Sequence, residues 1–211
     1  MAKMNLPMAL TLARIVAGPV VAALVLCGAV MEYVDRPVAA LFYVCAGALF
    51  VLAALTDWLD GYFARSLDLV SPLGAALDHC ADKVLIACVL IALAFQSLPL
   101  DLIVATILLL GRDLFIAGLR EGLSSSGRAP PVGQLGKWKT VAALIGVSAL
   151  VFERAAYLDQ APDWLYYATA WTGRAGVWAA VAFSLVSGWD YVATAFRGGA
   201  EASKSAADPA S

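Results

Sequence analysis

Long apolar segments, separated by short polar ones, make up most of the chain. A helix that crosses a bilayer needs about 20 mostly apolar residues, and six segments come close to that length. They cover approximately residues 8–30, 38–60, 76–97, 100–121, 138–153 and 174–196. Because lipid offers the backbone no hydrogen-bond partners, such segments must be helices or strands of a closed barrel, and their lengths suit helices. The sequence therefore predicts an all-α, polytopic membrane protein with six transmembrane helices.

The composition agrees with a chain that lies mostly in lipid. Hydrophobic residues make up 62% of it and charged residues 14%, whereas soluble domains are about 25% charged. The apolar stretch after Lys3 contains Arg14 and runs to Val30 without a convincing cleavage site, so we expect a retained first span and not a signal peptide. The lipid bilayer is the expected surrounding, and no nucleic-acid partner is expected. The net charge of −2 says little, because the distribution of Lys and Arg matters more than their sum.

The distribution of positive charge predicts the orientation. An even number of spans places both termini on one side of the membrane, and the other side holds only three of the 14 Lys and Arg residues: Arg36, Arg154 and Arg174. Because cytoplasmic loops carry the excess of Lys and Arg, both termini are expected in the cytoplasm, and the protein in the cell inner (cytoplasmic) membrane. Residues 1–197 are expected to form one membrane domain, and residues 198–211 a disordered cytoplasmic tail.

Four aspartates lie at the cytoplasmic ends of the second and third segments: Asp57, Asp60, Asp78 and Asp82. A carboxylate at a helix centre costs about 2.5–3.5 kcal/mol on insertion scales, and less near the interface. Four so close together indicate that a cation holds them. Carboxylate oxygens suit Mg²⁺, Mn²⁺ or Ca²⁺. Two ions about 3.5–4 Å apart, as in phosphoryl-transfer sites, would use all four.

Helical spacing gathers these aspartates on two faces together with small residues. One face holds Asp57, Asp60, Gly61 and Ala64, and the other holds Gly74, Asp78 and Asp82. The small residues leave space in which a flat base or a diphosphate can approach the backbone. Arg65 follows directly and is a candidate to meet phosphate oxygens. Salt-bridged carboxylates at helix ends are the alternative explanation.

The spacing Asp-x2-Asp-Gly-x2-Ala-Arg-x8-Gly-x3-Asp-x3-Asp resembles the signature of the CDP-alcohol phosphatidyltransferases. Every defined position is matched, at Asp57, Asp60, Gly61, Ala64, Arg65, Gly74, Asp78 and Asp82. The resemblance implies a six-span fold and a homodimer. It also implies an enzyme that transfers a phosphatidyl or similar group from a CDP-linked lipid to an alcohol and releases CMP.

The same resemblance implies a role for each residue of the signature. The ligands of a first Mg²⁺ would be Asp57, Asp60 and Asp78. Those of a second would be Asp57, Asp78 and Asp82, with Mn²⁺ as an alternative metal. Asp82 would also be the catalytic residue that takes the proton of the acceptor hydroxyl. The residues that make room for the CDP-lipid or contact it would be Gly61, Ala64, Arg65 and Gly74.

Segments outside the signature resemble the branch of the family that uses CDP-diacylglycerol and glycerol 3-phosphate and makes phosphatidylglycerophosphate. The segments are Asn5-Leu6-Pro7, Leu10 to Arg14, Gly111-Arg112-Asp113, Leu119-Arg120-Glu121, Gly136 to Thr140, and Ser184 to Ser187 with Tyr191. That branch more often has Arg-Glu at the position of Arg112-Asp113, a difference that conserves charge.

Basic residues near the cytoplasmic ends of the fourth and fifth segments fit an acceptor that carries a phosphate. They are Arg112, Arg120, Lys137 and Lys139, joined as candidates by Thr11 and Arg14 on one face of the first helix. Asp113 and Arg120 lie nearly on one helical face and are expected to orient each other. The usual excess of cytoplasmic cations explains the same basic residues without any pocket.

Two further functions fit the sequence. The first is the same chemistry with another acceptor, as in a phosphatidylinositol-phosphate, phosphatidylserine or cardiolipin synthase. The second is a divalent-cation transporter whose ion site is the four aspartates, because intramembrane carboxylates mark ion paths. Against transport, no matching acidic residues continue through the outer halves of the spans, where a two-sided path would need them.

Overall fold

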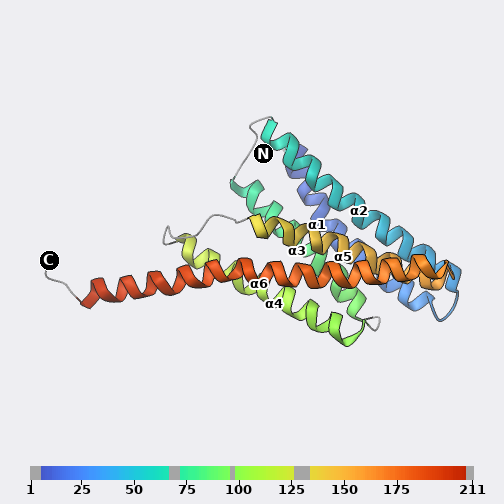
Figure 1. Ribbon diagram of the computed structural model, residues 1–211. Coiled ribbons are helices and arrows are strands. Elements are labelled where there is room, and N and C mark those ends of the chain that lie inside the picture. Colours follow the sequence, from blue (N-terminus) through green and yellow to red (C-terminus); the bar gives the residue numbers. More distant parts are fainter. Residues whose placement is uncertain (1–5, 67–71, 96–97, 126–133, 208–211) are drawn as a thin grey trace.

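The computed structural model describes residues 6–66, 72–95, 98–125 and 134–207 (Figure 1). Six α-helices make up most of these residues: α1 (Leu6–Met31), α2 (Arg36–Ser66), α3 (Pro72–Phe95), α4 (Leu100–Ser125), α5 (Gln134–Leu158) and α6 (Asp163–Ala207). No strand occurs within the described ranges, which confirms the all-α fold. Near some helix ends, notably the end of α2 and the start of α3, the backbone is described but most side chains are not.

Four of the helices are apolar and long enough to cross a bilayer. The candidate spans are Met8–Met31 in α1, Arg36–Thr56 in α2, Leu100–Leu123 in α4 and Leu135–Leu158 in α5. Large apolar side chains such as Val16, Leu41 and Ile107 are exposed on them, as expected where lipid and not water is the solvent. The protein is therefore an integral membrane protein. The crossing of the bilayer by α3 and α6 as well, giving six spans, remains a prediction.

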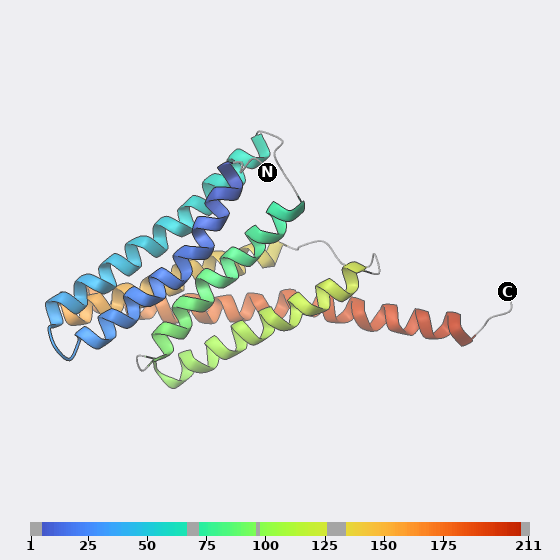
Figure 2. The same ribbon diagram turned by 180° about the vertical axis from the view of Figure 1, so that it is seen from behind.

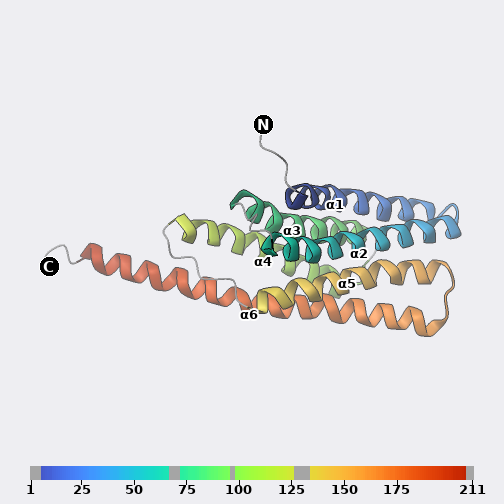
Figure 3. The same ribbon diagram turned by 90° about the horizontal axis from the view of Figure 1, so that it is seen from above.

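The helices lie side by side, roughly along a common direction (Figure 3). α1 packs against α2 and α3, α5 packs against α2 and α6, and α4 packs against α6. Seen from behind, α1, α3 and α4 lie in front of α6, whose C-terminal part extends beyond the other helices (Figure 2). The largest fully buried apolar side chains of the bundle include Val25, Tyr43, Phe50, Leu85, Leu90, Val147 and Val177.

Glycines allow two pairs of helices to approach closely. A Cβ atom at Gly146 of α5 would lie 2.6 Å from the backbone nitrogen of Val177 on α6, and one at Gly176 would lie 2.6 Å from the Cα of Gly146. In α1, a Cβ atom at Gly18 would lie 3.2 Å from the Cα of Leu85 on α3. Small residues at such contacts are typical of membrane helices, whose association depends on close packing.

Ion pairs at the end of the bundle away from the aspartates join helices that are distant in sequence. Arg154 of α5 donates from Nη2 to both carboxylate oxygens of Glu32, at 2.7 Å each. Arg174 of α6 donates to Asp101 of α4 over 2.8 and 2.9 Å. These pairs account for two of the three cations that the sequence assigns to the outer side. The third, Arg36, lies over the ring of Tyr157, 5.5 Å from its centroid.

Several helices are longer than the apolar segments that predicted them. α2 continues beyond residue 60 to Ser66, α5 begins at Gln134, and α6 begins at Asp163 instead of residue 174. At the other end, α6 is a helix as far as Ala207, and the division into a membrane domain and a tail from residue 198 remains a prediction. Hydropathy marks the part of a helix that suits lipid, whereas the length of a helix outside that part depends on propensity and local contacts. Residues 208–211 lie outside the described ranges.

Candidate active site

The four aspartates lie on the two helices that the sequence predicts. Asp57 and Asp60 are in the last turns of α2, and Asp78 and Asp82 are in the first half of α3. The link between the helices, residues 67–71, can span no more than about 22 Å, so these two helix ends lie on the same side of the bundle. Because both segments are helical, the predicted spacing of the aspartates on one face of each helix is retained.

Most side chains of the signature lie outside the described part of the structure. This applies to Asp57, Asp60, Gly61, Ala64, Arg65, Gly74 and Asp78, whose roles therefore remain predictions. Among the side chains that are described, no three His, Cys, Asp or Glu residues form a metal-binding group. Asp82 is the aspartate of the signature whose surroundings are described. Its donor chemistry, a partly exposed carboxylate, suits a hard divalent cation.

Asp82 contacts α1 through Arg14. Arg14 Nη1 donates to Asp82 Oδ1 over 3.3 Å. The Arg14 side chain is fully buried, whereas 25% of the Asp82 side chain is exposed. Thr11, one turn earlier in α1, is also buried. The expectation that α1 reaches the site thus agrees with the structure for Arg14, but the described partner of its guanidinium is a carboxylate.

A second cluster joins α4, α5 and α6 around Asp113. Lys139 of α5, only 9% exposed, donates from Nζ to both carboxylate oxygens of Asp113. Arg112 donates from Nη1 to Asp113 Oδ1 over 3.2 Å and from Nη2 to Ser187 Oγ on α6 over 2.9 Å. Ser187 in turn donates to the carbonyl oxygen of Ser184, 3.2 Å away. Two buried cations thus share one carboxylate, so the cluster retains a positive charge.

The cluster contains buried polar atoms that are free to bind a ligand. Arg112 Nε and Ser184 Oγ are buried and have no hydrogen-bond partner among the described residues. Such groups are costly unless something bonds to them. Gly188 of α6 leaves the space that the guanidinium occupies, because a Cβ atom there would lie 2.9 Å from Arg112 Nε. The cluster, comprising Arg112, Asp113, Lys139, Ser184, Ser187 and Gly188, is called the basic cluster below.

The other predicted cations differ in their placement. Lys83, which follows Asp82 directly, lies within electrostatic range of Asp113, Arg112 and Arg120. Arg120 therefore lies near the cluster, but Asp113 forms its ion pairs with Arg112 and Lys139. The expectation that Asp113 and Arg120 orient each other is thus not supported, because α5 brings a closer cation. Lys137, two residues before Lys139, is exposed on α5.

Consecutive residues of α3 connect the carboxylate centre to the basic cluster. Asp82 contacts Arg14 of α1, while Lys83 lies within electrostatic range of Asp113 of α4. A reaction centre at the aspartates and a binding site for an anion at the cluster would therefore be neighbours. The sequence indicated the individual charges of this arrangement. The resemblance also included Ser184 and Ser187, but it did not indicate that Ser184 Oγ is buried without a hydrogen-bond partner among the described residues. No sequence pattern indicated Gly188 as the space beside Arg112.

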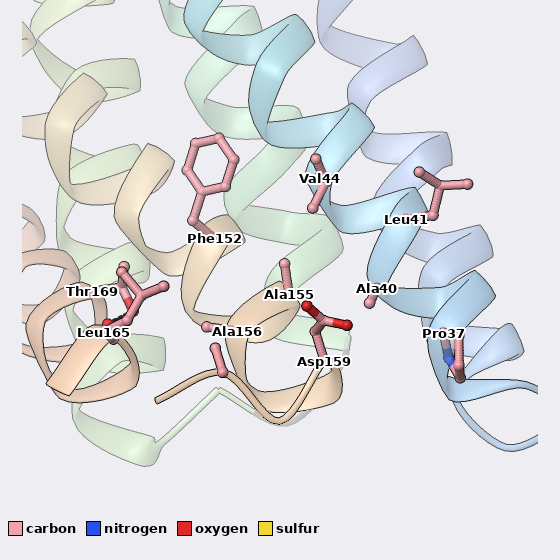
Figure 4. Close-up of a pocket in the computed structure, with 11 residues that line it drawn as sticks. Pro37, Ala40, Leu41, Val44, Phe152, Ala155, Ala156, Asp159, Leu165 and Thr169 are labelled. Carbon is pink, nitrogen blue, oxygen red and sulfur yellow. Dashed lines mark hydrogen bonds between the residues drawn. The ribbon is translucent and has the colours of Figure 1, made fainter. Parts of the chain in front are cut away.

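A groove at the opposite end of the bundle has a different character. It has a volume of about 400 Å³ and lies between α2, α5 and α6, with Val44, Phe152 and Leu165 among its lining residues (Figure 4). Asp159 is the charged residue of its lining, and no cation lines it. It therefore lacks the groups that would bind a diphosphate or a phosphate.

Comparisons with known proteins show the family to which the chain belongs. A family model described as CDP-alcohol phosphatidyltransferase matches residues 4–186. The chain is 38% identical to the CDP-diacylglycerol–glycerol-3-phosphate 3-phosphatidyltransferase of Bacillus subtilis, over 89% of this chain and 93% of that protein. It is 33% identical to the enzyme of the same name from Cereibacter sphaeroides, with the same coverage.

A relative with another acceptor is also similar. The CMP-forming cardiolipin synthase of Oryza sativa is 33% identical over 72% of this chain and 46% of that protein. The eight matched positions of the signature, the helical membrane fold and the family match over most of the chain lead to one conclusion. This protein belongs to the CDP-alcohol phosphatidyltransferase family.

Proposed function

We propose that this protein transfers the phosphatidyl group of CDP-diacylglycerol to sn-glycerol 3-phosphate, giving phosphatidylglycerophosphate and CMP. As a member of its family it is a phosphatidyltransferase of phospholipid biosynthesis. The choice of acceptor is supported by relatives that carry the name of this reaction and cover nearly the whole chain. The structural observation that carries it is the buried basic cluster next to Asp82, because only a phosphorylated acceptor would use it.

The reaction is a single displacement at the lipid-bearing phosphorus. A hydroxyl oxygen of glycerol 3-phosphate forms the new bond to that phosphorus. The bond from phosphorus to the oxygen of CMP breaks, and CMP leaves with the electron pair. Asp82 receives the proton of the attacking hydroxyl, as a carboxylate within hydrogen-bond reach can. No covalent intermediate with the enzyme forms.

The aspartates are proposed to hold two Mg²⁺ ions, for which Mn²⁺ can substitute. Family members generally depend on a divalent metal. One ion would be held by Asp57, Asp60 and Asp78, and the other by Asp57, Asp78 and Asp82. Bound metal would neutralise the diphosphate and stabilise charge on the departing CMP. Gly61, Ala64 and Gly74 would leave room for the cytidine diphosphate, and Arg65 would meet its phosphate oxygens.

The acceptor phosphate is proposed to bind at the basic cluster. Lys139 is buried there and Arg112 is 15% exposed, and Arg112 Nε has no hydrogen-bond partner among the described residues. A planar guanidinium and an ammonium together suit a dianionic phosphate. Arg120 and Lys137 would extend the positive surface towards the cytoplasm and attract the acceptor. The site is proposed to open on the cytoplasmic side of the inner membrane, in a homodimer.

Release of CMP by the purified protein tests the function. The protein receives CDP-diacylglycerol and Mg²⁺ in mixed micelles, with acceptors added one at a time and EDTA as a control. Release that requires both glycerol 3-phosphate and metal is the expected result. Release with phosphatidylglycerol alone would instead establish a cardiolipin synthase, the activity of one relative. Failure to release CMP with any acceptor, together with metal flux across sealed vesicles, would favour the transporter.

A further inference from the structure

We infer that Arg14 is a positioning residue for Asp82 and not a ligand of the acceptor phosphate. In this view α1 is part of the active site, because the Arg14 guanidinium holds the Asp82 carboxylate, which receives the acceptor's proton. The inference rests on the proposed function of Asp82. It replaces the expectation, drawn from sequence spacing, that Arg14 and Thr11 bind the acceptor from the first helix.

Burial separates Arg14 from an incoming acceptor. Its side chain is 0% exposed, whereas the Asp82 carboxylate in contact with it is 25% exposed. Solvent and ligands therefore reach Asp82 from the side opposite Arg14. One carboxylate oxygen, Oδ1, accepts from Arg14 Nη1 at 3.3 Å. The carboxylate is thus held by a buried guanidinium while its side chain remains partly exposed.

Close packing of α1 on α3 sets this contact. Gly18 lies four residues after Arg14, and Leu85 lies three residues after Asp82, so the two contacts are adjacent turns of the same parallel helix pair. A Cβ atom at Gly18 would be 3.2 Å from Leu85 Cα and 3.4 Å from its backbone nitrogen. Backbone cannot move aside as a flexible side chain can, so α1 would have to shift by some tenths of an ångström.

The basic cluster offers the contrast that identifies the role of each arginine. The Arg112 side chain is 15% exposed and donates to Ser187 as well as to Asp113, whereas the Arg14 side chain is 0% exposed and donates to Asp82. Arg14 lies on the α1–α3 side of Asp82, whereas Arg112 lies with α5 and α6 on the side of Lys83. One guanidinium is therefore directed to the catalytic carboxylate, and the other is available to the phosphate.

Steady-state kinetics separate positioning from binding. We expect Arg14→Gln to lower kcat by tenfold or more, in the range of about 10²-fold that a misplaced reacting group can cost. The KM for glycerol 3-phosphate should stay within about twofold, since a residue outside the phosphate site contributes no uniform binding. Arg14→Lys, which retains the charge, should recover part of kcat. Gly18→Ala should lower kcat in the same way as Arg14→Gln.

The same substitution at Arg112 in the basic cluster provides the comparison for Arg14→Gln. Arg112→Gln should raise the KM for glycerol 3-phosphate with a smaller effect on kcat, the reverse of the pattern for Arg14→Gln. A large rise in that KM for Arg14→Gln, with kcat unchanged, would overturn the inference and make Arg14 a phosphate ligand. Unchanged kinetics in Arg14→Gln would also overturn it.

A second measurement uses metal-free protein and does not depend on activity. Thermal unfolding in detergent with EDTA is compared for Arg14→Gln, Asp82→Asn and the double variant. Because the two side chains are in contact, the double variant should lose clearly less than the sum of the single losses. Additive losses would contradict the contact. If the wild-type protein releases no CMP when glycerol 3-phosphate is added, the proposed function is wrong. The unfolding measurements would still test the contact between Arg14 and Asp82.

Discussion

Lys139 of α5 donates to both carboxylate oxygens of Asp113 on α4, and both helices pack against α6. The pair thus bridges two helices across the surface of a third. Because Arg112 shares the same carboxylate, one aspartate balances two buried cations. A bound phosphate can neutralise the positive charge that remains.

Removal of the Lys139 charge should weaken acceptor binding. We expect Lys139→Gln to raise the KM for glycerol 3-phosphate about 10- to 100-fold, since a hydrogen bond to a charged group contributes about 1.5–3 kcal/mol. The KM for CDP-diacylglycerol should change little. Lys204→Gln, the same substitution near the end of α6, is the control and should leave both constants unchanged. Equal increases in the two KM values would show that the cluster is not specific to the acceptor.

The space beside Arg112 should be as important for acceptor binding as the charge of Arg112. In Gly188→Ala, the new Cβ atom would lie 2.9 Å from Arg112 Nε and 3.1 Å from Nη2, so the guanidinium must move. The KM for glycerol 3-phosphate should rise by roughly tenfold, the effect of losing about 1.4 kcal/mol. Gly118→Ala is the matched control, because a Cβ atom there meets nothing within 4 Å. Identical kinetics for the two variants would show that the space at Gly188 does not affect acceptor binding by Arg112.

The sequence predicts the number of helices better than the residues at which they begin and end. Apolar runs indicated all six helices because hydropathy reports burial in lipid or core. They did not indicate that α6 begins at Asp163 and continues to Ala207. Its first turns contain Trp164, Tyr166 and Tyr167, which hydropathy scores as weakly apolar although they suit a membrane interface. Helix length outside the lipid depends on propensity and local contacts that a hydropathy window does not measure.

For the site, the sequence predicts residue types and the structure supplies the partners. The signature and its spacing identified Asp82, and the local excess of charge identified Arg112 and Lys139. The partner of Asp113 was misjudged, because spacing within α4 favoured Arg120 whereas α5 places Lys139 against it. Contacts between residues 26 positions apart in sequence arise from the packing of helices. No periodicity within one helix can reveal them.

Neutralising a signature aspartate should abolish turnover without unfolding the protein. We expect Asp78→Asn to lower CMP release at least 100-fold, because a lost ligand weakens the charge stabilisation that such sites provide, typically worth about 10²–10³ in kcat. Asp159→Asn is the control: this carboxylate lines the groove at the other end of the bundle (Figure 4) and should not affect the rate. Size-exclusion profiles in detergent should match the wild type for both variants. Near-wild-type activity of Asp78→Asn would remove the metal-site hypothesis.

The contact between Gly146 and Gly176 should govern stability rather than catalysis. α5 and α6 form the most extensive helix pair, and their backbones approach so closely that a Cβ atom at Gly146 would lie 2.6 Å from Val177 N and 2.8 Å from the carbonyl carbon of Gly176. Gly146→Ala therefore forces the helices apart. Overpacking of this kind costs about 1–3 kcal/mol, which should lower the unfolding temperature in detergent.

The separation of α5 from α6 also bears on the active site, because α5 carries Lys139 and α6 carries Ser187. Lys139 and Ser187 lie on the same helix pair as Gly146 and Gly176, nearer to its predicted cytoplasmic end. If the helices move apart as rigid rods, Gly146→Ala should raise the KM for glycerol 3-phosphate as well as lower stability. If α5 bends locally, stability alone should fall. Measuring both quantities in Gly146→Ala, with Gly118→Ala as the control at a position open to added atoms, distinguishes the two. We expect the local effect, since Lys139 is held directly by Asp113 of α4.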